Sequence, residues 1–343
     1  MTERQGDPVF DLIGKYRLQI MGFAALWLFF YHTQDSCLLF PTTPFIGDIE
    51  TLFACNGYAG ADMFFFLSGI GMVHSISKHT IPQFYLRRFL RIWPPFAISG
   101  TITAIIFKWS FPDYLLTITG VSFYAKSLFS LIWFVPAIGT LYLLFPLYHQ
   151  MMKRIKRKII PTLILFAIWF VLSFLWKSDA PRGDLSIFTN RIPVFLFGVY
   201  CGYLSREKKI RFGSMGRIIL FAVWAVGIIL MSFSEYYEGL DFSHYLIKYI
   251  GAAMVSSTMC VFLALIFDKL EKVKLIGKIF GLVGVMSLEM YCSFELVMNI
   301  LRPKLFGVME NHLYTLVLFV IVLAYSILLY QFTRLIRKKI MYN

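Results

Sequence analysis

The sequence predicts an all-α membrane protein, a polytopic helical bundle of about ten transmembrane helices. Of the 343 residues, 58% are hydrophobic and only 15% are charged. The mean hydropathy of +0.69 is far above that of an ordinary soluble domain. Apolar stretches long enough to cross about 30 Å of hydrocarbon cover residues 18–37, 57–77, 92–110, 130–151, 159–176, 189–205, 217–233, 246–267, 278–300 and 313–333. The polar first 17 residues carry no cleavage site, so we expect the first helix to remain as an anchor.

The basic residues lie mainly in alternate loops. An even number of spans places both termini on one side, and if that side is the cytoplasm, 25 of the 33 Lys and Arg residues fall inside. The positive-inside rule favours this orientation, with residues 1–17 and 334–343 as cytoplasmic segments. The net charge of +14 is thus mainly a topology signal. Dispersed basic residues do not indicate a nucleic-acid partner. Every loop is short, so residues 1–343 are predicted to form a single integral membrane domain.

The five cysteines do not indicate a metal site. The sequence has no CxxC motif and no His/Cys cluster, so no structural zinc or other metal is expected. Cys37 and Cys55 share the predicted outer side. Their spacing alone leaves open whether they form a disulfide.

A few ionisable residues lie within the predicted spans, mostly in their middle or outer halves. They are His32, Asp62, Arg191, Glu289 and Glu295. A charged group in hydrocarbon costs about 2.5–3.5 kcal/mol on insertion scales, so these residues are candidates for function and could line one cavity. Alternatively, Arg191 could snorkel to the interface, Asp62 could cap a helix, and His32 could be an interface histidine. Glu289, about nine residues into a predicted helix, needs a partner.

A second group of charges lies on the opposite side of the membrane. Arg88 and Arg91 are three residues apart, so they share one face of a predicted helix at its cytoplasmic start. Guanidinium groups so placed suit a phosphorylated ligand, because their planar fork pairs with phosphate oxygens. The alternative is simple anchoring at the interface beside Trp93.

Six motifs follow one another along nearly the whole chain. They are MGFAALWLFFYH (21–32), GYAGADMFFFLSGIGM (57–72), RRFLRIWPP (87–95), LIWFVPAI (131–138), NRIPVFLFGVYCG (190–202) and VMSLEMYCSFELV (285–297). In this order they resemble the acyltransferase 3 family of bacterial membrane O-acyltransferases. The resemblance implies transfer of an acyl group, usually acetyl from acetyl-CoA, to a hydroxyl of a cell-surface glycan. It implies no tightly bound cofactor, and it places the protein in the cytoplasmic membrane.

The resemblance also suggests roles for individual residues. It implies that His32 is the catalytic histidine, acting as general base, and that Arg88 and Arg91 bind the donor. Asp62 or Glu289 could orient His32 and so complete a catalytic group. The remaining candidates, assigned to the cavity or the acceptor, are Ser68, Trp133, Arg191, Tyr291 and Glu295. Whether Ser68 or an outer tyrosine carries a covalent acyl group is left open.

The chain departs from the family pattern at two positions. Met21 stands where the family usually has Arg or Lys, eleven residues before the histidine, and Phe294 stands where a His often follows Tyr291. Arg17, one turn earlier on the helix, could replace the missing basic group and contact the donor; the alternative is that it is one more positive-inside anchor at a helix start. The expected partners are acyl-CoA, a glycan acceptor and the lipid bilayer, with the oligomeric state left open. One alternative function is a transporter or flippase for a glycan or lipid intermediate, although the sequence shows no paired broken helices. The other, suggested by Met21, is a non-catalytic binding or regulatory membrane protein related to the acyltransferases.

Overall fold

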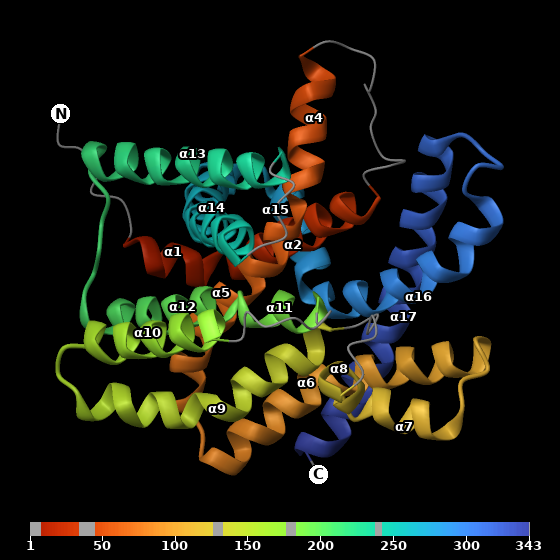
Figure 1. Cartoon of the computed structure of the whole chain (residues 1–343), viewed down its shortest axis with the longest axis horizontal. Coiled ribbons are helices and arrows are strands. Elements are labelled where there is room, and N and C mark those ends of the chain that lie inside the picture. The colour runs from red at the N-terminus through yellow and green to blue at the C-terminus, as the bar shows by residue number, and fades with distance from the viewer. Residues whose placement is uncertain (1–7, 34–44, 126–132, 176–182, 237–241, 343) are drawn as a thin grey trace.

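The fold confirms the all-α prediction. The computed structural model describes residues 8–33, 45–125, 133–175, 183–236 and 242–342, and no strand occurs in these ranges (Figure 1). The helices are α1 (Val9–Lys15), α2 (Arg17–His32), α4 (Ile46–Cys55), α5 (Ala59–Ile76), α6 (Ile81–Ile106), α7 (Phe111–Ile118), α8 (Val121–Ala125), α9 (Phe134–Arg154), α10 (Ile159–Leu175), α11 (Gly183–Thr189), α12 (Ile192–Glu207), α13 (Ser214–Tyr236), α14 (Phe242–Lys269), α15 (Lys274–Val285), α16 (Ser287–Leu305) and α17 (Asn311–Tyr342). Cys37 lies outside the described residues, so its pairing with Cys55 is not described.

Each predicted span overlaps a helix, but fewer helices are both long and apolar enough to cross a membrane. Six meet this requirement, over Ile46–Ile76, Ile81–Ile106, Ile187–Glu207, Ser214–Ser234, Leu246–Lys272 and Asn311–Met341. A bent pair, α15 with α16, adds a seventh if it is one span. Helix α2 has 16 residues and is therefore about 24 Å long, less than the hydrocarbon thickness. The chain is thus a multi-pass membrane protein by the length and composition of its helices.

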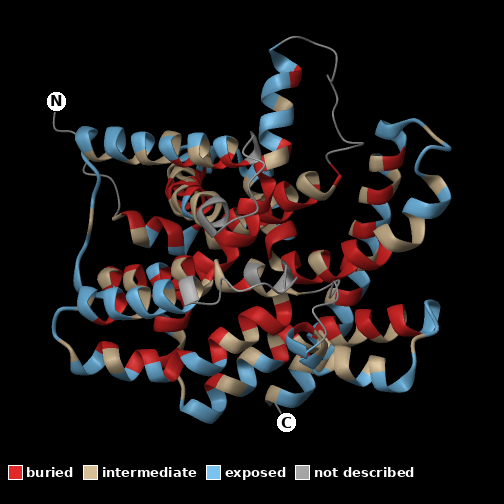
Figure 2. Ribbon diagram, viewed as in Figure 1, coloured by how far each residue is buried: buried red, intermediate tan, exposed pale blue. Residues whose placement is uncertain are grey.

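Helix α5 forms the centre of the bundle. It contacts α2, α6, α9, α12 and α14, and almost every one of its side chains is buried (Figure 2). Its sequence explains this position, because small residues allow close approach of neighbouring helices and the run Phe64–Phe66 fills the space between them. The outer faces of the surrounding helices expose large apolar side chains, such as Leu143 and Leu147 of α9, as expected for lipid contact.

Glycines bring pairs of helix backbones into direct contact. A Cβ on Gly22 of α2 would clash with the carbonyl of Phe280 in α15, and one on Gly284 would clash with the carbonyl of Leu18. This pattern is typical of membrane helices that associate through small residues. Helix α2 is therefore packed closely against α15 near its start, and it also contacts α5.

The continuous helix predicted over residues 278–300 is broken in the structure. The helix breaks at Met286, and α15 and α16 are bent by 67°. A kink frees backbone carbonyls that need new partners, and the Val285 carbonyl accepts a hydrogen bond from Arg91 Nη2 at 3.0 Å. Glu289 consequently lies in the first turn of α16 rather than deep within a helix.

We predict that Gly284→Ala destabilises the protein by about 1–3 kcal/mol, because the added methyl group must push α2 and α15 apart. Gly277→Ala is the matched control on the same helix, since no atom lies within 4 Å of a Cβ at Gly277. Thermal unfolding of the two variants in detergent measures the difference. Equal melting temperatures would contradict the proposed backbone contact.

Candidate active site

Helix α2 separates two groups of functional side chains. Arg17 is its first residue and His32 its last, so their Cα atoms lie about 22 Å apart along the axis. Helix α5 runs alongside in the opposite direction, with Gly71 next to Arg17 and Tyr58, just before its start, next to Tyr31. We call the charged residues near the start of α2 (Arg17, Arg88, Arg91, Glu289 and Arg337) the arginine cluster.

Arg17 points into the bundle. Its guanidinium lies against Gly71, where any Cβ would clash with it. Its charge is close enough to interact with Tyr142, Arg88 and Arg91. Within the described ranges no carboxylate forms an ion pair with Arg17. Gly71 of α5 thus makes room for the inward-facing Arg17 side chain.

Arg88 is held by aromatic rings instead of a carboxylate. Its guanidinium carbon lies 5.7 Å from the ring centroid of Phe84 and 5.5 Å from that of Tyr142. Its Nε is buried without a hydrogen-bond partner. The Tyr142 hydroxyl donates a hydrogen bond to Ser68 Oγ at 3.3 Å. Cation–π contacts orient Arg88 but leave its charge available to an anion.

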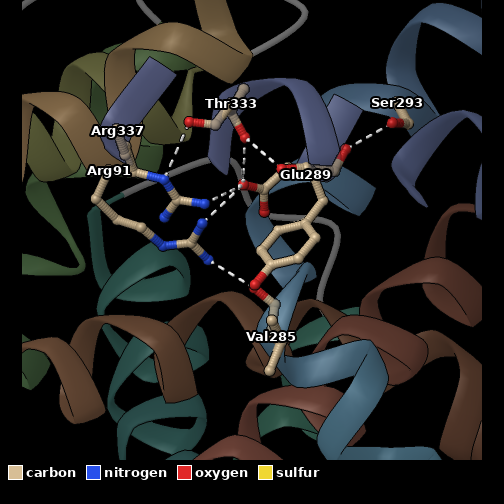
Figure 3. Close-up of polar contacts among 7 residues, drawn as sticks. Arg91, Val285, Glu289, Ser293, Thr333 and Arg337 are labelled. Carbon is tan, nitrogen blue, oxygen red and sulfur yellow. Dashed lines mark hydrogen bonds and ion pairs between the residues drawn. The ribbon is translucent and has the colours of Figure 1, made fainter. Parts of the chain in front are cut away.

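Arg91 is paired, as Figure 3 shows. Its Nη1 lies 2.7 Å from Glu289 Oε1, and the Glu289 side chain is fully buried. The same oxygen accepts a hydrogen bond from Thr333 Oγ1 at 3.3 Å and lies 3.8 Å from Arg337 Nη2. Glu289 Oε2 has no hydrogen-bond partner. The carboxylate that the sequence placed in a catalytic group with His32 therefore belongs to the arginine cluster, where it joins α6, α16 and α17.

His32 lies among aromatic rings at the other end of α2. Its ring centroid is 5.1 Å from that of Phe294 and 5.1 Å from that of Tyr31. In the part of the chain that the structure describes, the imidazole makes no hydrogen bond, and none joins it to Asp62. Its nitrogen atoms are therefore available to a ligand. Phe294 supports the ring from the position where the resemblance often has a histidine.

Asp62 and Arg191 form a buried ion pair near this end of α2. Arg191 Nε lies 3.5 Å from Asp62 Oδ2, and both side chains are at most 4% exposed. Arg191 therefore does not snorkel to the interface, and Asp62 does not cap α5. The Arg191 guanidinium carbon is 4.9 Å from each of the ring centroids of Trp133 and Tyr249. The expected outer cavity residues Asp62, Arg191 and Trp133 thus do come together.

The last two cavity candidates lie on α16. The Tyr291 ring packs against Phe134, with centroids 5.6 Å apart, and Glu295 is buried next to Phe294. Contacts between Tyr31 and Tyr58, whose ring centroids are 5.6 Å apart, connect His32 to the start of α5. We call His32, Asp62, Arg191, Trp133, Tyr291 and Glu295, with the rings between them, the histidine group.

Several residues at these sites are absent from the sequence motifs. Tyr142, Tyr249, Thr333 and Arg337 contact the predicted site residues but lie outside the motifs. One feature of the sequence could have pointed to Arg337, because the last turns of its helix are basic. No group of three or more His, Cys, Asp or Glu side chains able to hold a metal ion occurs in the described residues.

We predict that Glu289→Ala lowers the stability by roughly 3–5 kcal/mol, because it leaves two guanidinium groups without their shared carboxylate. Glu310→Ala, at an exposed position before α17, is the control and should change stability by no more than about 0.5 kcal/mol. Unfolding curves of both variants in detergent provide the measurement. A Glu289→Ala protein as stable as wild type would show that the buried pair is dispensable.

Comparison with known proteins identifies the family. A family model for an acyltransferase domain, Acyl_transf_3, matches residues 20–331. No curated protein and no solved structure matches the chain. The match supports an acyltransferase and lends no support to the transporter alternative. Because this match covers most of the chain, the chain belongs to the acyltransferase 3 family and is a membrane acyltransferase.

Proposed function

We propose that this protein transfers an acyl group, in the first instance acetyl, from acyl-CoA to a hydroxyl of a cell-surface polysaccharide or a related envelope glycan. One observation carries the proposal. Among the described residues, Arg17 at the start of α2 and Arg88 beside it form no ion pair with a carboxylate, and His32 at the end of α2 makes no hydrogen bond. An anionic donor and a hydroxyl acceptor would need these two features respectively.

The separation of the two features suits a long donor. A coenzyme A ester carries its phosphates at one end and its thioester at the end of an extended pantetheine arm. With the phosphates on Arg17 and Arg88, the arm would run beside α2 and α5 towards His32. Ser68 lies on this route, three residues from Gly71 and six from Asp62, or about 5 Å and 9 Å along α5. We propose that Ser68 and Tyr142 line the path of the arm.

The proposed reaction requires one group that first accepts a proton and then donates it. An imidazole nitrogen of His32 would remove the proton from the acceptor hydroxyl as its oxygen attacks the thioester carbonyl. The carbon–sulfur bond then breaks, an oxygen ester forms, and the imidazolium returns the proton to the departing thiolate. The products are the acylated glycan and free CoA thiol. We propose this direct transfer, because no described residue hydrogen-bonds to the His32 imidazole and so competes for its proton-accepting nitrogen.

The surroundings of His32 support a sugar as acceptor. A sugar offers hydroxyl groups on its edges and carbon–hydrogen faces that pack on aromatic rings. Trp133 supplies a ring, and Asp62, Arg191 and Glu295 supply polar groups nearby. We propose that these residues orient the acceptor and that Tyr291 lines the same pocket.

We further propose that the protein lies in the cytoplasmic membrane with both termini in the cytoplasm. The excess of basic residues in alternate loops supports this orientation. It would place the arginine cluster on the side where acyl-CoA is made. It would also place His32 towards the side where envelope glycans are displayed.

We predict that His32→Ala lowers the rate of acyl transfer by about 10²–10⁴-fold, the usual contribution of a general base. Alanine is compatible with a helix, so insertion and abundance should be unchanged. Transfer of labelled acetyl from acetyl-CoA to envelope glycan in isolated membranes gives the rate. His312→Ala, at an exposed position of α17, should keep full activity. Full activity in a well-inserted His32→Ala protein would refute the proposed function.

We predict that Arg88→Ala raises the KM for acetyl-CoA about tenfold or more while changing kcat little, because a charge-assisted phosphate contact is lost. Arg88→Lys should recover only part of the affinity, since an ammonium lacks the planar fork. The neighbouring, exposed Arg87 provides the control variant Arg87→Ala. If Arg87→Ala and Arg88→Ala behave alike, Arg88 is only an anchoring charge.

A further inference from the structure

Arg337 lies in the last part of α17, beyond residue 331, where the family match ends. It belongs to a basic run that includes Arg334 and Lys338, and both of these are exposed. Arg337 instead turns inward, with a side chain only 17% exposed. Its Nε donates a hydrogen bond to the Thr333 carbonyl at 3.3 Å (Figure 3). Its orientation therefore differs from that of an ordinary anchoring charge.

Arg337 competes with Arg91 for one carboxylate. Arg91 Nη1 is 2.7 Å and Arg337 Nη2 is 3.8 Å from the same Glu289 Oε1, so Arg337 holds the weaker share. The two arginines are close enough to repel each other. Arg17 and Arg88 add two further guanidinium groups near Arg91. Among the described residues, two arginines share the Glu289 carboxylate and two more lie near Arg91, an excess of positive charge that favours binding of additional negative charge.

The cluster has two sides, with Arg91 between them. Arg17 and Arg88 both face Tyr142, whose hydroxyl points to Ser68 and so towards the route to His32. Arg337 comes from α17 and interacts with Arg91 and Glu289, whereas Arg17 interacts with Arg88 and Arg91. A ligand that uses the whole cluster would carry two separate anionic groups. The group nearer its reactive end would meet Arg17 and Arg88.

We propose that Arg337 binds the phosphomonoester on the ribose of the coenzyme A donor, while Arg17 and Arg88 bind the diphosphate. This inference rests on the proposed function. The diphosphate is the group joined to the pantetheine arm, so it belongs on the side that leads to His32. The ribose phosphate lies at the far end of the donor and fits the remaining cation. Arg337 is then a specificity-determining residue that distinguishes coenzyme A from its dephosphorylated form.

The alternative is that Arg337 only stabilises Glu289. The two roles differ in their dependence on the donor. A structural role would raise the KM for every donor by the same factor. A phosphate-binding role would raise the KM only for donors that carry the ribose phosphate.

The test compares KM values for acetyl-CoA and acetyl-dephospho-CoA in the full-length protein. We expect the wild type to favour acetyl-CoA by about tenfold or more, the effect of one charge-assisted contact. In Arg337→Ala the ratio of the two KM values should fall towards one, and Arg337→Lys should give an intermediate ratio. Arg334→Ala, with an exposed arginine on the same helix, should keep the wild-type ratio. An unchanged ratio in Arg337→Ala would overturn the inference.

A measurement on the wild-type protein covers the case in which Arg337→Ala does not fold. Adenosine 3′,5′-bisphosphate should inhibit transfer from acetyl-CoA more strongly than adenosine 5′-monophosphate, because it carries the phosphate that Arg337 binds. Equal inhibition would overturn the inference and leave the proposed function standing. If the wild type uses neither acetyl donor, the proposed function fails, and the inference fails with it.

Discussion

The ion pairing of the buried Glu289 carboxylate with Arg91 and Arg337 is the interaction on which the arrangement of the arginine cluster depends. It draws Arg91 of α6 and Arg337 of α17 to the first turn of α16. Arg91 in turn donates to the Val285 carbonyl that the helix break leaves free. A carboxylate placed there without cations would carry a large desolvation penalty, and the arginines without it would repel one another. Charge pairing and the bend between α15 and α16 therefore stabilise each other.

The fixed length of α2 adds a second constraint. Gly22 and Gly284 bring the first part of α2 against α15, and Gly57 and Gly60 pack against its later part, so α2 cannot shift without breaking close contacts. An arginine that begins this helix and a histidine that ends it are held about 22 Å apart. The separation keeps the strong positive potential of the arginine cluster away from the imidazole. A base has to remain neutral in order to accept a proton, so this distance favours its proposed role.

The sequence predicted the all-α class and a helix at each apolar stretch, because apolar stretches bounded by charged loops depend on local composition. The expected number of ten membrane-crossing helices is not confirmed, since six helices, or seven with the bent pair, are long and apolar enough in the described residues. Of the ionisable residues expected to line one cavity, Asp62 and Arg191 are paired in the structure, whereas Glu289 lies in the arginine cluster. The sequence misplaced Glu289 because a continuous apolar stretch hides the break at Met286. Hydropathy cannot show a break whose freed carbonyl is satisfied by Arg91, about 200 residues away in the chain.

Pairings between distant residues also explain why Arg337 was not predicted as a site residue. At the end of a last helix, an arginine beside other basic residues has the pattern of a topology signal. The inward turn of Arg337 depends on Thr333 and Glu289, and the second of these lies on another helix. The same charge can therefore orient the chain in the membrane and contribute to a binding site. Basic residues at the cytoplasmic ends of helices favour insertion in the correct orientation and lie outside the hydrocarbon, where a charge costs little free energy. A helix that turns one of them inward therefore gains a group able to bind phosphate, and no new charge has to be placed in the hydrocarbon.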